Sequence, residues 1–105
     1  MKISEEAKNL LLRAVALLEG NGWTQRAFSR EIDGVDCFCA EGALLFSVKR
    51  DAQDMDGSGF REASDRIREV LRENHGYLNG LISWNDEVAQ NKQDVINLFL
   101  EAAND

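Results

Sequence analysis

The stretch DCFCAEGALLFSV, residues 36–48, decides the fold, because nearly all of its side chains are apolar. This run predicts a central buried helix from Cys37 to Val48, with Asp36 positioned to cap its start. Gly42 lies inside this helix, where glycine costs about 1 kcal/mol relative to alanine. Its use there indicates that another backbone segment packs closely against the helix.

The segment before this helix carries a turn signal. Within residues 24–36, the dipeptide Asp33-Gly34 stands between two apolar residues, a pattern typical of a tight hairpin turn. We therefore expect a short two-stranded ribbon. The alternative is a helical turn over residues 25–31 capped by Thr24, because the apolar side chains of this segment also fit helical spacing.

Four other segments carry apolar residues at three- and four-residue spacing, which gathers those side chains on one helix face. They are residues 5–19 after the capping Ser4, residues 60–75 before Gly76, a short helix within 77–84 that Asn85-Asp86 ends, and a last helix from Asn91, where Asp94 completes a capping box. The glycine-asparagine-glycine run at 20–22 is expected to end the first helix in a left-handed conformation. The predicted fold is all-α: a compact bundle of four to five short helices forming a single domain over residues 1–105, with a possible small β-hairpin near residues 24–36.

Length and composition suit one autonomous domain. The 105 residues are 44% hydrophobic, which is enough to build a core without metals or disulfides. No apolar run approaches the ~20 residues that a bilayer requires, and the first 20 residues lack a cleavage site, so neither membrane insertion nor export is expected. Cys37 and Cys39 are too close together to close a useful loop, which predicts reduced thiols and a cytoplasmic location.

The charge of the chain constrains its partners. Nineteen acidic and twelve basic residues give a net charge of −7, which repels phosphate backbones and anionic lipid surfaces. We therefore expect no direct nucleic-acid binding and no membrane binding, and instead a protein partner with a basic surface. Residues 49–59 read as an exposed acidic loop, in which Asp51, Asp54 and Asp56 are candidate binding residues.

Five anchors in the sequence together resemble a known family. They are Gly22-Trp23-Thr24-Gln25, Asp33-Gly34, the Cys39-x-x-Gly42-Ala43-Leu44 helix, Trp84-Asn85-Asp86 and Asp94-Val95. In this order they resemble a family of small uncharacterised domains found in actinobacteria, other bacteria and phages, over roughly residues 7–103. The resemblance implies a shared fold and a phage or mobile-element context, but no known activity, cofactor or substrate. The 49–59 loop is more acidic than the family pattern, so the partner can differ.

A thiol nucleophile is the one catalytic arrangement whose residue types are present. Cys37 or Cys39 could be activated by His75, with Asp86 or Asn85 orienting the imidazole, because a thiolate needs a base and the base needs an orienting group. The alternative, which we favour, is that Cys39 packs as a small buried hydrophobic residue.

The sequence predicts neither a metal nor a cofactor. Zinc would find only Cys37, Cys39 and His75, one ligand short of a tetrahedral site. An alignment of the acidic loop with a calcium-binding loop at Gly57 places alanines, Ala52 and Ala63, where two essential carboxylates belong.

The remaining candidates for binding are aromatic and polar. Trp23 and Trp84 are expected in the core, although a shared exposed aromatic patch would be a binding hot spot. Asn85 and Asp86 are interpreted as a turn and cap before the last helix, with side chains that could also hold a ligand.

Taken together, these features predict a non-catalytic protein-binding accessory or regulatory module, encoded by a phage or mobile element, whose acidic loops meet a basic partner. A sharper form is an inhibitor that occupies the nucleic-acid-binding surface of a host protein. The alternatives are a small cysteine-dependent enzyme that uses Cys37 or Cys39 with His75, and a purely structural homo-oligomer. The sequence leaves the oligomeric state open.

Overall fold

The computed structural model describes residues 3–50 and 57–104, and within them the chain is mostly helical with a small sheet. The helices are α1 (Glu5–Gly20), α2 (Ala40–Arg50), α3 (Ser58–His75), α4 (Leu81–Glu87) and α5 (Lys92–Ala103). The strands are β1 (Gly22–Trp23), β2 (Ser29–Ile32) and β3 (Val35–Phe38). The expected number of helices is confirmed, while the all-α class is corrected to helices with a three-stranded sheet.

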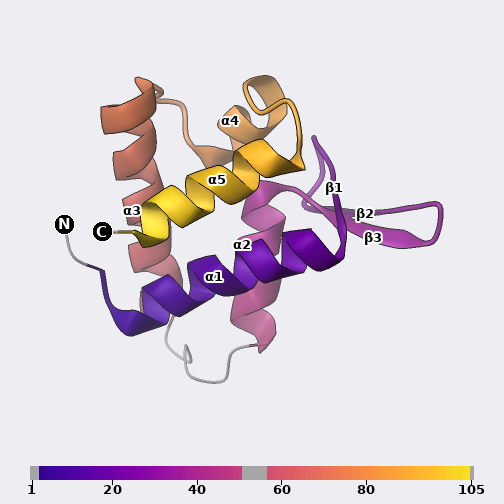
Figure 1. Cartoon of the computed structure of the whole chain (residues 1–105), viewed down its shortest axis with the longest axis horizontal. Coiled ribbons are helices and arrows are strands. Elements are labelled where there is room, and N and C mark those ends of the chain that lie inside the picture. Colours follow the sequence, from indigo (N-terminus) through magenta and orange to yellow (C-terminus); the bar gives the residue numbers. More distant parts are fainter. Residues whose placement is uncertain (1–2, 51–56, 105) are drawn as a thin grey trace.

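Helix α1 packs against α2, α3 and α5. The apolar faces of these four helices meet in one core, whose fully buried side chains include Leu11, Leu44, Ile67 and Phe99. The β2–β3 hairpin projects from one end of the helices, and the two chain termini lie at the opposite end (Figure 1). None of the helices in the described part of the chain is long and apolar enough to cross a membrane.

The helix ends follow the local signals in most cases. Ser4 caps α1 by accepting a hydrogen bond from the Ala7 amide at 3.2 Å, and Asn91 caps α5 by accepting one from the Asp94 amide at 2.9 Å. Gly76 ends α3 in the left-handed conformation, with φ of 64°. The end of α1 differs from the prediction: Asn21 is extended, because the chain continues directly into β1.

The hairpin prediction is confirmed, and the helical alternative over residues 25–31 is wrong. Strands β2 and β3 are antiparallel, and Asp33 and Gly34 both take positive φ values (52° and 79°), as a two-residue hairpin turn requires. The hairpin extends from residue 29 to residue 38, beyond the predicted limit. Strand β1 pairs with β3 in parallel, so the order in the sheet is β1-β3-β2.

The central helix begins later than predicted. Its first residue is Ala40, and Cys37 and Phe38 belong to β3. Asp36 therefore lies in the sheet and does not cap the helix. The apolar run crosses from a buried strand end into a buried helix, and burial alone does not distinguish the two states.

Close backbone packing at Gly42 is confirmed. A Cβ atom at this position would lie 1.9 Å from the carbonyl oxygen of Phe28, in the segment that leads into β2. Gly22 is constrained in a similar way, because a Cβ there would lie 2.3 Å from the Cys37 Sγ. The two glycines thus let the sheet approach α2 and let β1 approach β3.

The predicted boundary after Trp84 is wrong. Helix α4 begins at Leu81, after Gly80, and continues to Glu87, so Asn85 and Asp86 lie within it and do not form a turn. Trp84 and Asn85 are both buried. The Asn85 side chain has its hydrogen-bond partners in the interior. Asp51, Asp54 and Asp56 lie outside the described residues.

Candidate functional site

Residues from the sequence anchors meet in a buried hydrogen-bond network around Asn85. The Asn85 side chain is fully buried, and its Oδ1 accepts hydrogen bonds from Trp23 Nε1 at 2.8 Å and from the Ala40 amide at 2.9 Å. Its Nδ2 donates to the Thr24 carbonyl at 3.2 Å and to Asp86 Oδ1 at 3.0 Å. An asparagine side chain has two acceptor sites and two donor hydrogens, so all four are used.

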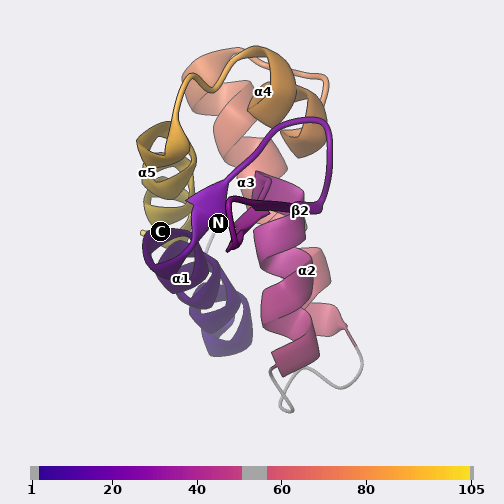
Figure 2. The ribbon, with the colours of Figure 1, turned by 90° about the vertical axis from the view of Figure 1, so that its right-hand side faces the viewer.

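Two further side chains form hydrogen bonds between the 23–26 segment and α4. Gln25 Nε2 lies 3.0–3.2 Å from the carbonyl oxygens of Asn85, Asp86 and Ala89, at the end of α4. The carboxylate of Asp86 accepts a hydrogen bond from the Arg26 amide at 2.9 Å, where Arg26 has a positive φ of 65°. We call Trp23, Thr24, Gln25, Asn85 and Asp86 the Asn85 cluster. Figure 2 shows this segment reaching from β1 towards α4 before it returns to β2.

Three of the predicted binding residues belong to the Asn85 cluster. Trp23, Asn85 and Asp86 are brought together, and their polar groups are bonded within the chain. Trp84 is 5% exposed and lies in the core, with its ring centroid 6.4 Å from that of His75. Trp23 is only half-buried and packs against the edge of the core, so the expectation of a core position is confirmed for Trp84 and not for Trp23.

The predicted thiol and imidazole groups have separate partners. Cys39 Sγ accepts a hydrogen bond from the Gly42 amide at 3.3 Å, and Cys37 Sγ lies 3.6 Å from the Val35 carbonyl oxygen. His75 Nε2 lies 2.9 Å from Glu101 Oε1. Among the described residues no hydrogen bond joins the imidazole to either thiol.

The environment of Cys39 disfavours the thiolate. Burial raises the pKa of the Cys39 thiol, although the backbone N–H groups of Gly42 and Glu41 act in the opposite direction. The cysteine is 3% exposed, so a reagent reaches it poorly. Within residues 3–50 and 57–104, no three His, Cys, Asp or Glu side chains are grouped in a way that could hold a metal ion.

The turn end of the β2–β3 hairpin carries exposed residues that were not among the binding residues predicted from the sequence. Paired residues lie on the same face of a hairpin, and successive residues alternate between faces. Ile32 is paired with Val35, and both are exposed on one face at 42% and 48%. Glu31 is paired with Asp36, and both are exposed on the other face. We call these four residues, together with Asp33 in the turn, the hairpin tip.

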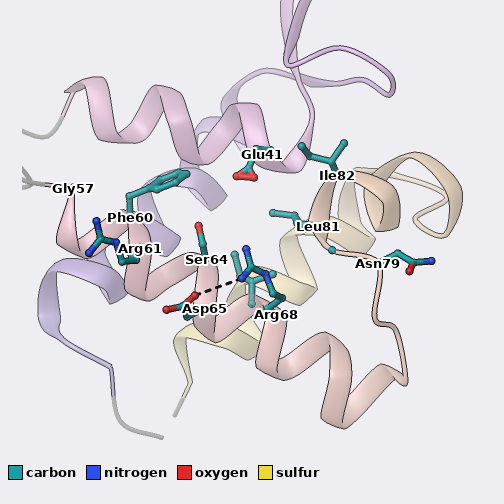
Figure 3. A pocket seen from close by; sticks show the side chains of 12 residues that line it. Glu41, Gly57, Phe60, Arg61, Ser64, Asp65, Arg68, Asn79, Leu81 and Ile82 are labelled. Carbon is teal, nitrogen blue, oxygen red and sulfur yellow. Dashed lines mark ion pairs between the residues drawn. The ribbon is translucent and has the colours of Figure 1, made fainter.

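A pocket of about 600 Å³ lies between α2, α3 and α4 (Figure 3). Its polar and charged lining includes Glu41, Arg61, Ser64, Asp65 and Arg68, and its apolar lining includes Phe60, Ile67, Leu81 and Ile82. Burial raises the pKa of the Glu41 carboxyl, and the positive charge of Arg68 partly offsets that effect. The sequence could not indicate this pocket, because its walls come from three separate helices.

The fold and its surfaces define a small helical domain with a sheet fastened to it by a buried asparagine network. No active-site arrangement of the predicted kind is assembled in the described part of the chain. The chain belongs to the family of unknown function DUF6197, whose family model matches residues 3–105. The expected membership in a family of uncharacterised small domains is thereby confirmed. Neither the curated proteins nor the solved structures contain a significant match.

Proposed function

We propose that this chain is a non-catalytic protein-binding module whose hairpin tip docks on a basic surface of its partner. The observation that carries the proposal is the direct pairing of Glu31 with Asp36 across the two strands. Together with Asp33 these residues place three carboxylates on six consecutive residues, 31–36. None of the three has an ion-pair partner among the described residues.

The arrangement favours a cationic partner on physical grounds. Like charges directly opposite each other on a hairpin destabilise it. Lysine or arginine side chains of a partner would relieve this repulsion on binding, and complementary charge would also increase the rate of association. Docking would cover Ile32 and Val35 as well, which adds the burial of apolar surface to the electrostatic attraction.

The hairpin also has an open edge, because β2 lies at the outside of the sheet and all four of its residues are exposed. An open strand edge offers unpaired backbone groups to another chain. The resemblance to bacterial and phage domains supplies the context of a phage- or mobile-element-encoded regulator. In its sharpest form the proposal is an inhibitor that occupies the nucleic-acid-binding surface of a host protein.

The test combines capture of the partner with measured affinities. Tagged wild-type chain is used to capture proteins from the native host, and the affinity of the captured partner is then measured for three versions of the chain. Glu31→Lys/Asp36→Lys reverses two charges of the hairpin tip. Glu19→Lys/Glu73→Lys is the matched control, since it makes the same change in net charge at exposed positions of α1 and α3.

We expect a basic, nucleic-acid-binding partner whose affinity falls about tenfold or more in the hairpin variant and much less in the control. The affinity of the wild type should also fall steeply as salt is raised, because salt screens exposed charges. Equal losses in the two charge-reversed chains, or binding that is indifferent to salt, would exclude docking through the hairpin tip.

A further inference from the structure

The pocket between α2, α3 and α4 has the size and lining of a small-molecule site. Its volume of about 600 Å³ lies within the range of cavities that enclose small ligands, and such sites combine apolar walls with a few placed polar groups. In Figure 3, Glu41 on α2 faces Ser64 on α3 across the pocket, and Arg68 lies one turn further along α3. Leu81 and Ile82 close the side formed by α4.

Two acceptor groups at this pocket have no hydrogen-bond partner in the described part of the chain. The Ser64 hydroxyl oxygen is enclosed, and nothing in the described part of the protein bonds to it. The half-buried Glu41 carboxylate likewise has no hydrogen bond to any described residue. A buried polar group without a partner destabilises the fold, so a ligand that donates a hydrogen bond to Glu41 would satisfy this carboxylate.

The positive groups stand beside these acceptors. Arg68 approaches Asp65 only to 3.8 Å, and both side chains are well exposed, at 71% and 58%. An exposed ion pair of this length is weak, so the guanidinium of Arg68 remains able to bind a carboxylate in the two-pronged manner typical of arginine. Arg61 adds a second positive group to the lining, and the charges of Glu41, Asp65, Arg61 and Arg68 balance.

We propose that this pocket binds a small zwitterion with an apolar body, of the α-amino acid class. The ammonium group donates to Glu41. The carboxylate of the ligand binds Arg68. The apolar side chain packs against Phe60, Leu81 and Ile82. The pocket and the hairpin tip share no residues, so this proposal can be tested independently of the protein-binding proposal.

The first experiment titrates the full chain with L-leucine and with two analogues that each lack one charge. The analogues are 3-methylbutylamine, which keeps the amine, and 4-methylpentanoate, which keeps the acid. Backbone amide chemical shifts report binding. L-Leucine should shift the residues that line the pocket saturably, and each analogue should bind at least about tenfold more weakly because it leaves one charged group unpaired. Absence of saturable shifts at the pocket overturns the proposal, as does an analogue that binds as well as leucine.

The second experiment removes the two charged contacts one at a time. Glu41→Gln and Arg68→Gln should each weaken leucine binding by about tenfold or more. Glu73→Gln and Arg72→Gln are the matched controls, because these two residues form an exposed pair of 3.8 Å near the end of α3 and do not line the pocket. Thermal unfolding of each variant establishes that it is folded. An unchanged affinity in either pocket variant, or an equal loss in its control, contradicts the assignment.

Discussion

The Asn85 cluster draws part of its residues from the segment just before the hairpin that carries the hairpin tip, yet the polar groups of the two regions have opposite surroundings. In the cluster, the side chain of Asn85 is fully buried and all of its hydrogen-bonding capacity is used. At the tip, Glu31 and Asp36 face each other in solvent and Ile32 and Val35 expose apolar surface. The hydrogen bonds of the cluster therefore stabilise the fold, whereas the facing like charges of the tip are expected to lower its stability.

The largest effect is expected for Asn85→Ala, which removes the side chain at the centre of the Asn85 cluster. The substitution leaves the indole N–H of Trp23 and the amide of Ala40 without an acceptor. Each buried unpaired donor costs about 1–3 kcal/mol, so the free energy of unfolding should fall by about 4 kcal/mol. Urea denaturation monitored by circular dichroism measures the change.

The control for this variant is Asn97→Ala, at an exposed position of α5, where Gln93 is the one side-chain partner of Asn97 among the residues that the structure describes. It should change the free energy of unfolding by less than about 0.5 kcal/mol. If Asn85→Ala were equally mild, the cluster would not be what holds the sheet to the helices.

A second way to test the comparison is Gly42→Ala, at the point where α2 meets the segment that carries the hairpin. The new Cβ would lie 1.9 Å from a backbone oxygen, that of Phe28, so the backbone has to move. We expect a loss of about 3 kcal/mol in thermal or urea unfolding, at the upper end of the usual cost of overpacking.

Gly20→Ala provides the matched control. No atom lies within 4 Å of the Cβ position at Gly20, the last residue of α1. Alanine there should leave stability unchanged or raise it by about 0.5 kcal/mol, because it restricts the unfolded chain. A similar loss in the two variants would mean that the contact with Phe28 is not what makes alanine costly at position 42.

The features that the sequence predicted correctly depend on neighbouring residues. The caps at Ser4 and Asn91 act over three residues, and the Asp33-Gly34 turn is set by the conformations of the two residues themselves. Gly42 was informative because a glycine inside an apolar helix is costly without a packing reason. Together with the spacing of the apolar residues, these signals were sufficient to predict four to five helices and a possible hairpin.

The features that the sequence could not supply depend on distant residues. Asn85 bonds to Trp23 and Ala40, which lie 62 and 45 residues away in the chain, so a reading based on neighbours treated it as a turn. The third strand escaped notice because β1 has only two residues and pairs in parallel with β3. The pocket likewise exists only after three helices have packed together.

The hairpin tip can be altered in the opposite direction by Asp36→Lys. This change turns the repulsive pair with Glu31 into an attractive one, so the free energy of unfolding should rise by about 0.5 kcal/mol. The same change at Asp65, which lies 3.8 Å from Arg68, should be neutral or destabilising. Thermal unfolding of both variants gives the two signs. A loss of stability in Asp36→Lys would show that the carboxylate has a stabilising role and that repulsion between Glu31 and Asp36 does not destabilise the hairpin.

The smallest expected effect comes from Glu101, an acidic residue of α5 that differs from the hairpin acids in having partners. Burial acts to raise its pKa, but hydrogen bonds from His75 and Asn74, with the positive charges of His75 and Arg66, outweigh burial and lower the pKa below the ordinary value. Because the folded-state pKa is lowered, Glu101 stabilises the protein above the unfolded-state pKa of about 4.3. That contribution is lost as the pH falls through the folded-state pKa.

Glu101→Gln should therefore lower the free energy of unfolding near pH 6 by only about 0.3 kcal/mol, since the exposed pair is screened by solvent. The difference from wild type should close below about pH 4. Glu31→Gln should have the opposite sign near pH 6, because it removes one of two facing charges. Urea unfolding across this pH range would contradict the contrast between partnered and unpartnered acids if both variants were destabilised alike.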